Sequence, residues 1–450
     1  MSNQTAAERG ARTYELDRAH VFHSWSAQDL ITPMVVESAQ GSYVTDASGK
    51  RYLDFSSQLV NTNIGHQHPK VVAAIQAQAA KLCTIAPQHA NDQRSEAARL
   101  ITERVPATLN KVFFTNGGTE AVEHAVRMAR LHTGRPKVLS AYRSYHGATA
   151  TSINLTGDHR RWANDTATAG VVHFFGPFLY RTAFHSSSEE EETTRALEHL
   201  RDLISFEGPS TIAAIILETV PGTAGIMPPP PGYLAGLRAL CDEFGILYIA
   251  DEVMCGFGRT GSWFAFEQYD VVPDLVTFAK GVNSGYVPLG GVIISDDVAA
   301  TFANRVYPGG LTYSGHPLAC SAAVATISAM EEEGIVSNAA MIGRDHLGPM
   351  LRALAERHPL IGEVRGLGVF FALDLVRDRD TKEPLAPYGG TSPEMTALVA
   401  SAKAKGLLLF ANYNRIHCVP PCTVTPDEVD EGVAILDAAF SEVSSTFGQE

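Results

Sequence analysis

Short apolar runs alternate with amphipathic stretches along most of the chain beyond residue 111. Residues 247–250 form one such run and residues 275–279 form another. Runs of this length that are apolar throughout are typical of strands buried on both faces of a parallel sheet. Stretches with helical periodicity lie between the runs, so the pattern predicts an α/β fold with a mostly parallel central sheet.

The same pattern predicts further elements in order along the chain. Three more strands and two helices are expected in the central region: strands at 112–114, 138–141 and 212–217, helices at 121–132 and 233–244. Gly134 is the expected stop of the first helix. Residues 155–195 lack periodicity and are expected to be irregular, and the acidic run at 189–192 is interpreted as the solvated start of a helix.

The two ends of the chain are expected to form smaller units. Residues 1–20 are polar, and we expect a partly ordered arm there, whereas residues 34–55 alternate around an Asp-Ala-Ser-Gly turn and predict an antiparallel meander. An amphipathic helix is expected over 69–81, so His66 and His68 before it are interpreted as a helix-entry loop and not as metal ligands.

The C-terminal pattern predicts a final α/β unit. Residues 364–374 and 406–419 are expected to be strands, and a helix over 426–441 is expected to close the unit. Helices are expected between the central region and this unit, up to about His358.

Composition narrows the class of protein. A chain of 450 residues with 45% hydrophobic and 19% charged residues supports a large domain and a smaller one with a substantial core. The net charge of −14 argues against a surface for nucleic acid or an anionic membrane. The six cysteines have no regular spacing, so neither a disulfide framework nor a metal site is expected. Without a long apolar span or an N-terminal signal segment in the sequence, we expect a cytoplasmic location.

Two of the predicted buried strands end in residues that can carry chemistry. One runs into Asp251 and Glu252, and the next ends at Lys280. Because ligands of open α/β sheets bind at the carboxyl ends of the strands, we expect these side chains to lie together there. Pyridoxal phosphate needs this pair, since a lysine forms a Schiff base with it and an aspartate keeps its pyridine nitrogen protonated.

A glycine-rich turn precedes the helix predicted at 121–132. The turn contains Gly118 and Thr119, and its free N–H groups and the helix dipole suit a phosphate group. Glycine pairs are common at helix starts, so the turn alone is a weak signal. Its position in front of Asp251 and Lys280 makes it the candidate phosphate cradle.

The order of these motifs resembles the signature of class III (ω-) aminotransferases, which are pyridoxal-phosphate-dependent enzymes of fold type I. The resemblance rests on the residues from Asp251 to Val253, the glycine-rich run 256–261, Lys280 with Gly281, and the run 285–291. It implies a large cofactor-binding domain and a small α+β domain formed by both termini. The expected boundaries are 1–64 for the N-terminal segment, 65–335 for the large domain and 336–450 for the C-terminal part.

The resemblance also implies roles for individual residues. Tyr145 is expected to stack on the cofactor ring, Val253 to pack on the opposite face, and Glu218 to lie near the phenolic oxygen. The glycine-rich turn is expected to hold the phosphate. Thr312 corresponds to a residue that reaches the phosphate of the neighbouring subunit's cofactor, which implies a homodimer or a dimer of dimers with shared active sites.

The substrate pocket departs from many ω-transaminases in two places. Those enzymes have Leu-Trp where this chain has Leu59 and Val60, which implies a wider pocket; Trp25 is a further pocket candidate. Many also carry a mobile arginine near the position of Phe410 that binds the substrate carboxylate. The nearby arginine here is Arg415, which we expect on a polar loop as a partner for carboxylate or sulfonate, with a surface arginine on a strand turn as the alternative.

The predicted activity is transamination of an ω-amino acid or primary amine with a keto acid, in two half-reactions through Lys280. Pyruvate is the expected acceptor. A class III aminomutase, racemase or dialkylglycine decarboxylase would use the same Lys280 and Asp251 and stays open as an alternative. A non-catalytic cofactor-binding regulator is expected to lack one of these residues or to carry a DNA-binding segment, and the sequence shows neither.

Overall fold

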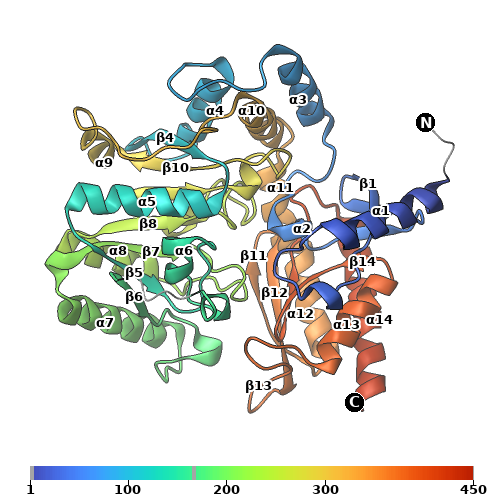
Figure 1. The fold of residues 1–450 in the computed structure, drawn as a ribbon. Helices are drawn as coiled ribbons and strands as arrows, with labels where there is room; N and C mark the ends of the chain where they lie inside the picture. The colour runs from blue at the N-terminus through green and yellow to red at the C-terminus, as the bar shows by residue number, and fades with distance from the viewer. Residues whose placement is uncertain (1–4, 165–168, 449–450) are drawn as a thin grey trace.

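The computed structural model describes residues 5–164 and 169–448, and its largest element is a sheet of seven strands (Figure 1). In spatial order these are β4 (Leu109–Thr115), β10 (Gly290–Ser295), β9 (Leu275–Phe278), β8 (Leu247–Asp251), β7 (Ile212–Glu218), β5 (Lys137–Ala141) and β6 (Val171–Phe174). The pairs from β9 to β6 are parallel, while β10 is antiparallel to both β4 and β9. The predicted mostly parallel central sheet is confirmed.

The apolar strands are buried because helices cover the sheet on both sides. Successive residues of a strand point to opposite faces. In β7, Ile216 belongs to a core cluster with helix α5 (Gly118–Thr133), whereas Ile215 belongs to the cluster that contains α7 (Glu189–Glu207) and α8 (Tyr233–Phe244). Both faces of the strand are therefore dry, which explains its apolar sequence.

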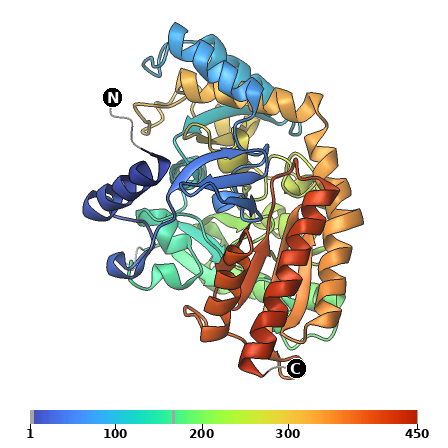
Figure 2. The same cartoon turned by 90° about the vertical axis from the view of Figure 1, so that its right-hand side faces the viewer.

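Two smaller sheets use the ends of the chain. The first contains β1 (Val36–Gln40), β2 (Tyr43–Asp46), β3 (Arg51–Asp54) and β14 (Leu407–Leu408); the second contains β11 (Ile361–Leu367), β12 (Phe370–Asp378), β16 (Arg415–Cys418) and β15 (Phe410–Asn412), with β13 (Glu383–Pro384) paired to β12. Strands β1 to β3 form the predicted antiparallel meander. Strand β14 pairs in parallel with β3, so N- and C-terminal segments lie side by side (Figure 2). The predicted boundaries at residues 64 and 335 are compatible with this pairing and stay a prediction.

Eleven further α-helices lie in the described part of the chain. They are α1 (Ala6–His20), α2 (Ser57–Val60), α3 (Pro69–Lys81), α4 (Asp92–Thr102), α6 (Ala150–Leu155), α9 (Asp296–Ala300), α10 (Pro317–Glu332), α11 (Ile335–Ile342), α12 (Gly348–Arg357), α13 (Pro393–Ala404) and α14 (Pro426–Phe447). No helix in the described part of the chain is both long and apolar enough to cross a membrane.

Three local predictions need correction. The expected N-terminal arm is helix α1, which starts with a capping box between Thr5 and Glu8 that the sequence analysis overlooked. The region expected to be irregular contains strand β6. The single strand expected over 364–374 is part of a hairpin of β11 and β12, which turns at Gly368 with a φ of 56°.

Candidate active site

A cavity of about 1010 Å³ lies where the strands of the large sheet end. This volume is at the upper end of the range typical of small-molecule sites. Ten of the residues singled out from the sequence line it: Trp25, Leu59, Val60, Gly118, Thr119, Tyr145, Glu218, Asp251, Val253 and Lys280. The structure thus brings together residues that are up to 255 positions apart, from Trp25 to Lys280. Their individual roles stay predictions.

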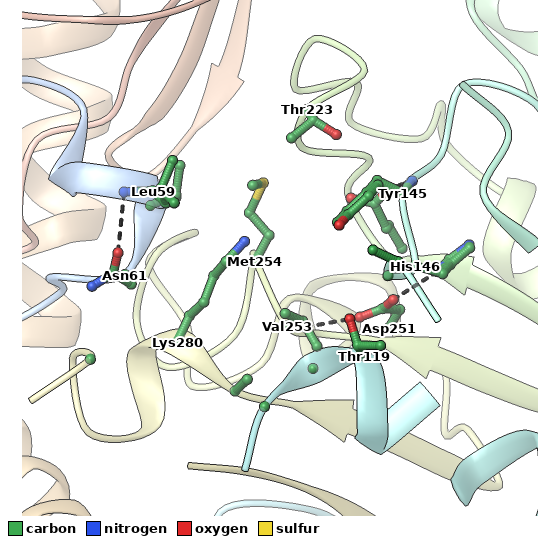
Figure 3. A pocket seen from close by; sticks show the side chains of 18 of the residues that line it. Leu59, Asn61, Thr119, Tyr145, His146, Thr223, Asp251, Val253, Met254 and Lys280 are labelled. Atoms are coloured by element: carbon green, nitrogen blue, oxygen red, sulfur yellow. Dashed lines mark hydrogen bonds and ion pairs between the residues drawn. The ribbon is translucent and has the colours of Figure 1, made fainter. Parts of the chain in front are cut away.

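Asp251 ends β8 and is held from behind by a histidine (Figure 3). Its Oδ2 lies 2.7 Å from Nδ1 of His146, and its Oδ1 accepts a hydrogen bond of 3.1 Å from the Val253 backbone N–H. Both side chains are buried. These contacts fix the orientation of the carboxylate in the cavity wall, as a pyridine nitrogen requires. His146 directly follows Tyr145, but no motif in the sequence indicates its contact with Asp251.

Lys280 follows β9, and its side chain extends into the cavity (Figure 3). Burial lowers the pKa of the Lys280 amine from 10.5 to about 8, because desolvation outweighs the attraction of Glu218 and Asp251. A substantial fraction of the amine is therefore neutral slightly above neutral pH. A neutral amine is the form that can attack an aldehyde or accept a proton.

Glu218 ends β7 and braces the segment that carries Tyr145. Its Oε1 accepts a hydrogen bond of 2.8 Å from the Tyr145 N–H, and its Oε2 accepts one of 2.8 Å from the Gly222 N–H. Burial, with a smaller contribution from the nearby charge of Asp251, raises the pKa of Glu218. The carboxyl group thus lies in a dry wall of the cavity, where it orients Tyr145.

The N-terminus of α5 forms a cradle for an anion. No side chain caps this helix end at Gly117, so its first N–H groups remain open to the cavity. A Cβ at Gly118 would lie 2.7 Å from Cγ1 of Val253, so only glycine allows the helix end to come this close. Thr119 adds a hydroxyl group next to these N–H groups. The arrangement suits a phosphate.

The described residues therefore fit pyridoxal phosphate. The cavity offers an amine for the aldehyde, a carboxylate for the ring nitrogen and a helix N-terminus for the phosphate. Tyr145 and Val253 supply an aromatic and an aliphatic wall between these groups.

The predicted substrate residues differ in their surroundings. Trp25 and Leu59 are 67% and 49% exposed at the mouth of the cavity. Val60 is buried and adopts a φ of 59°, which is strained for a β-branched residue. Thr312 is exposed and lies outside the cavity lining.

The expectation that Arg415 lies on a mobile loop is wrong. Arg415 is part of strand β16, which pairs with β12, and it is 8% exposed. Its Nη1 donates to the Ala224 carbonyl and its Nε donates to the Asn412 carbonyl at 3.4 Å. Burial lowers the pKa of Arg415 to about 10. Pairing of β16 with β12 on one side and β15 on the other explains why this polar segment is ordered, and Arg415 does not line the cavity.

A different arginine reaches the cavity. Arg160, in the 3-10 turn η2 (His159–Arg161), lines it together with Thr223 and Asn412. The guanidinium carbon of Arg160 lies 3.7 Å from the ring centre of Tyr145. No motif in the sequence marks these three residues: Arg160 and Thr223 lie in aperiodic segments, and Asn412 lies in a stretch that was expected to be a strand but carried no site assignment.

Comparison with known proteins gives the family. Residues 25–440 match the family described as Aminotransferase class-III. The chain is 37% identical to the 5-aminovalerate aminotransferase of Pseudomonas aeruginosa, over 92% of this chain and 95% of that one. It is also 37% identical to the 4-aminobutyrate aminotransferase of Escherichia coli, over 92% and 94%.

A solved structure gives the same result. The taurine:2-oxoglutarate aminotransferase of Bifidobacterium kashiwanohense, in complex with PLP and glutamate, superposes with a TM-score of 0.95 at 39% identity. The match covers 99% of both chains.

Proposed function

Because the chain belongs to the class III aminotransferases, it is a pyridoxal-phosphate-dependent enzyme of fold type I, and we propose that it transfers an amino group from an ω-amino acid or primary amine to a 2-oxo acid. The observation that carries the proposal is the convergence of Lys280 and the paired Asp251 and His146 in one cavity. Pyridoxal phosphate supplies the electron sink that makes a substrate C–H bond acidic.

The side chains of this protein supply binding and proton transfer. The Lys280 amine, with its lowered pKa, accepts the proton from the substrate carbon at Nζ and returns it during transfer of the amino group. Asp251 would hold the ring nitrogen of the cofactor, and His146 keeps the Asp251 carboxylate in the required orientation. The N-terminus of α5 holds the phosphate and so fixes the reacting carbon relative to Lys280.

The relatives support the choice of donor and acceptor. The two curated relatives are named for 4-aminobutyrate and 5-aminovalerate, and the structural neighbour for taurine and 2-oxoglutarate. All three donors carry the amine at one end and an anion at the other. Pyruvate, which the sequence analysis expected as acceptor, is therefore to be compared directly with 2-oxoglutarate.

A donor and acceptor panel tests the proposal. The holoenzyme is mixed with taurine, β-alanine, 4-aminobutyrate or 1-phenylethylamine, and the visible absorbance of the lysine-bound cofactor is followed. Donors should remove this absorbance, and pyruvate or 2-oxoglutarate should restore it with formation of the new amino acid. Turnover that needs no oxo acid would instead support an aminomutase or racemase, and release of carbon dioxide from a dialkylglycine would support a decarboxylase.

We also propose a homodimer as the active unit, with Thr312 serving the phosphate site of the partner. The exposure of Thr312 outside its own cavity supports this assignment. Cofactor and dimer should then stabilise each other by linkage. Sedimentation of the holoenzyme should show a dimer or larger, and a fully active monomer would contradict the proposal.

A further inference from the structure

We propose that Arg160 binds the anionic far end of the substrate, either a carboxylate or a sulfonate. This inference rests on the transamination proposed above and specifies the substrates it favours. Among the described residues that line the cavity, Arg160 carries the one guanidinium group. Burial lowers the pKa of the neighbouring His159, so this imidazole is neutral at pH 7 and offers no competing charge.

The position of Arg160 suits the far end of a substrate. Its Nη2 donates a hydrogen bond of 3.0 Å to Oγ1 of Thr223. Figure 3 shows Thr223 and Thr119 in separate parts of the pocket, with Tyr145 between them. An amine held near Lys280 can therefore extend away from the phosphate cradle and towards Arg160.

The guanidinium group has donors left for a ligand. Its Nε lies 2.9 Å from Oδ2 of Asp158, and its Nη2 contacts the same carboxylate as well as Thr223. Nη1 has no hydrogen-bond partner within residues 5–164 and 169–448. Since the Arg160 side chain keeps 21% of its surface exposed, Nη1 can bind a carboxylate or sulfonate oxygen from the cavity.

Asp158 explains how the same pocket can hold uncharged amines. A buried arginine without a partner would penalise a neutral substrate, because its charge would be left uncompensated. The Asp158 carboxylate, itself only 5% exposed, compensates Arg160 when no anion is bound. The cation therefore does not need to leave the pocket.

The surroundings of Arg160 still favour an anion. Behind Asn412 lies Arg415, which has no carboxylate partner in the described part of the chain. Asp374 is shared between Arg181 and Arg365, at 2.8 and 3.2 Å, and Arg365 also pairs with Glu363. This side of the pocket thus carries more guanidinium groups than carboxylates, and the resulting positive potential adds to the contact with Arg160.

Two side chains of the second small sheet hold the backbone at Thr223, the hydrogen-bond partner of Arg160, in place. Asn412 Nδ2 donates to the Thr223 carbonyl at 2.8 Å, and Arg415 donates to the adjacent Ala224 carbonyl. Both contacts tie the segment of Thr223 to the second small sheet. Arg415 is therefore a positioning residue for the anion site, not a ligand.

Two variants test the assignment. Arg160→Gln removes the charge, and Arg161→Gln, in the same turn, is the matched control. The apparent KM in the donor half-reaction is measured for β-alanine and taurine, and for n-butylamine, whose far end is uncharged. Arg160→Gln should raise KM for both anionic donors by about tenfold or more, as expected for loss of a charged hydrogen bond. The values for n-butylamine, and all values for Arg161→Gln, should change little.

A binding measurement separates this inference from the proposed activity. Propionate and ethanesulfonate are the amine-free analogues of β-alanine and taurine, and their binding to the holoenzyme is measured by calorimetry. The wild type should bind them at least about tenfold more tightly than Arg160→Gln. If Arg160→Gln fails to fold, Arg160→Lys is used. It should also lower the affinity for both anions, but by less than Arg160→Gln, because the charge is kept.

Each outcome is decisive. Equal effects on charged and uncharged donors, or unchanged binding of both analogues, would overturn the role of Arg160. A wild-type enzyme that binds the analogues but transaminates no donor would leave the anion site intact and refute the proposed function. Weakening for ethanesulfonate alone would restrict the site to sulfonates, and weakening for propionate alone would restrict it to carboxylates.

Discussion

The lowered pKa of Lys280 makes the stability of the cofactor-free protein depend on pH. The pKa of its amine falls from 10.5 in the unfolded chain to about 8 in the fold. Below pH 8 the Lys280 amine is charged in the folded protein, and its desolvation lowers the free energy of unfolding. This destabilisation decreases as the pH rises from 8 to 10.5, because the amine is then neutral in the fold. Since the unfolded chain binds more protons in that window, stability rises with pH across it.

The lowering of the Lys280 pKa determines how much the free energy of unfolding changes. A difference of 2.5 pKa units at about 1.36 kcal/mol each corresponds to about 3 kcal/mol. This is an upper bound, because the Lys280 side chain borders the cavity and water there relieves part of the desolvation. Lys280→Met, which removes the charge and keeps most of the chain length, should therefore stabilise the cofactor-free protein by up to about 3 kcal/mol at pH 7.

Thermal unfolding of the cofactor-free proteins at pH 7, 8, 9 and 10 measures this effect. The gap between Lys280→Met and wild type should be largest at pH 7 and should shrink towards pH 10. The exposed Lys403, changed to Met, is the matched control and should show no such trend. A gap that stays constant or widens with pH would refute the lowered pKa. The rate of cofactor uptake by wild type should rise through pH 8 for the same reason.

Three substitutions test the remaining assignments. Lys280→Ala should abolish turnover, and borohydride should fix the cofactor covalently to wild type only; a covalent adduct in the variant would place the reactive lysine elsewhere. Asp251→Asn should keep the fold and lose most activity, because an amide cannot hold the proton of the ring nitrogen, whereas near-native turnover would mean that another group does so. Arg415→Ala should weaken anionic donors less than Arg160→Gln does, because Arg415 acts only through the Ala224 carbonyl and the segment of Thr223; a loss for anionic donors larger than that of Arg160→Gln would return the anion site to Arg415.

The sequence was most informative where one physical requirement dominates. Helix α8 occupies residues 233–244, as predicted, because an apolar stripe defines its buried face and Gly245 defines its C-terminal end. Strands β8 and β9 were equally clear, since apolar runs buried on both faces have few alternatives. The presence of Asp251 and Lys280 in one cavity followed from their place at the strand ends.

Prediction failed where tertiary contacts decide the structure. The segment around Arg415 is polar enough to suggest a loop, but pairing with β12 makes it a buried strand. Arg160 gives no sequence signal, because its position depends on Asp158 and Tyr145, which fold beside it in an aperiodic stretch. Only the three-dimensional arrangement distinguishes the arginine that lines the cavity from the arginine that supports its wall.

The wall formed by residues 57–60 is held in a strained conformation by Asp54. Ser57, Gln58 and Val60 all have positive φ values, of 43°, 59° and 59°. Such conformations cost on the order of 1–3 kcal/mol each and persist only where neighbouring contacts impose them. Asp54 supplies part of these contacts, since its buried carboxylate accepts hydrogen bonds from the Gln58 backbone N–H at 3.3 Å, from the Gln58 side chain at 2.8 Å and from His66 at 3.0 Å.

Asp54→Asn should therefore affect the pocket as well as the fold. Although burial opposes ionisation, hydrogen bonds from His66 and neighbouring donors hold the pKa of Asp54 below its usual value, so the site is built for a carboxylate. An amide would direct its N–H groups at some of these donors, and the protein should lose on the order of 3 kcal/mol of stability. Without the hydrogen bonds to Asp54, the segment that contains Leu59 and Val60 should relax from its strained conformation. The altered cavity wall should then raise the apparent KM for bulky donors such as 1-phenylethylamine.

Asp46→Asn is the matched control for this prediction. Asp46 also accepts several hydrogen bonds, from Ser48, Lys50 and Tyr52, and it lies in the same N-terminal meander without lining the cavity. Both variants should therefore melt earlier than wild type, but only Asp54→Asn should change KM. Equal KM values for the two variants, measured well below either melting temperature, would show that the wall keeps its strained conformation without Asp54.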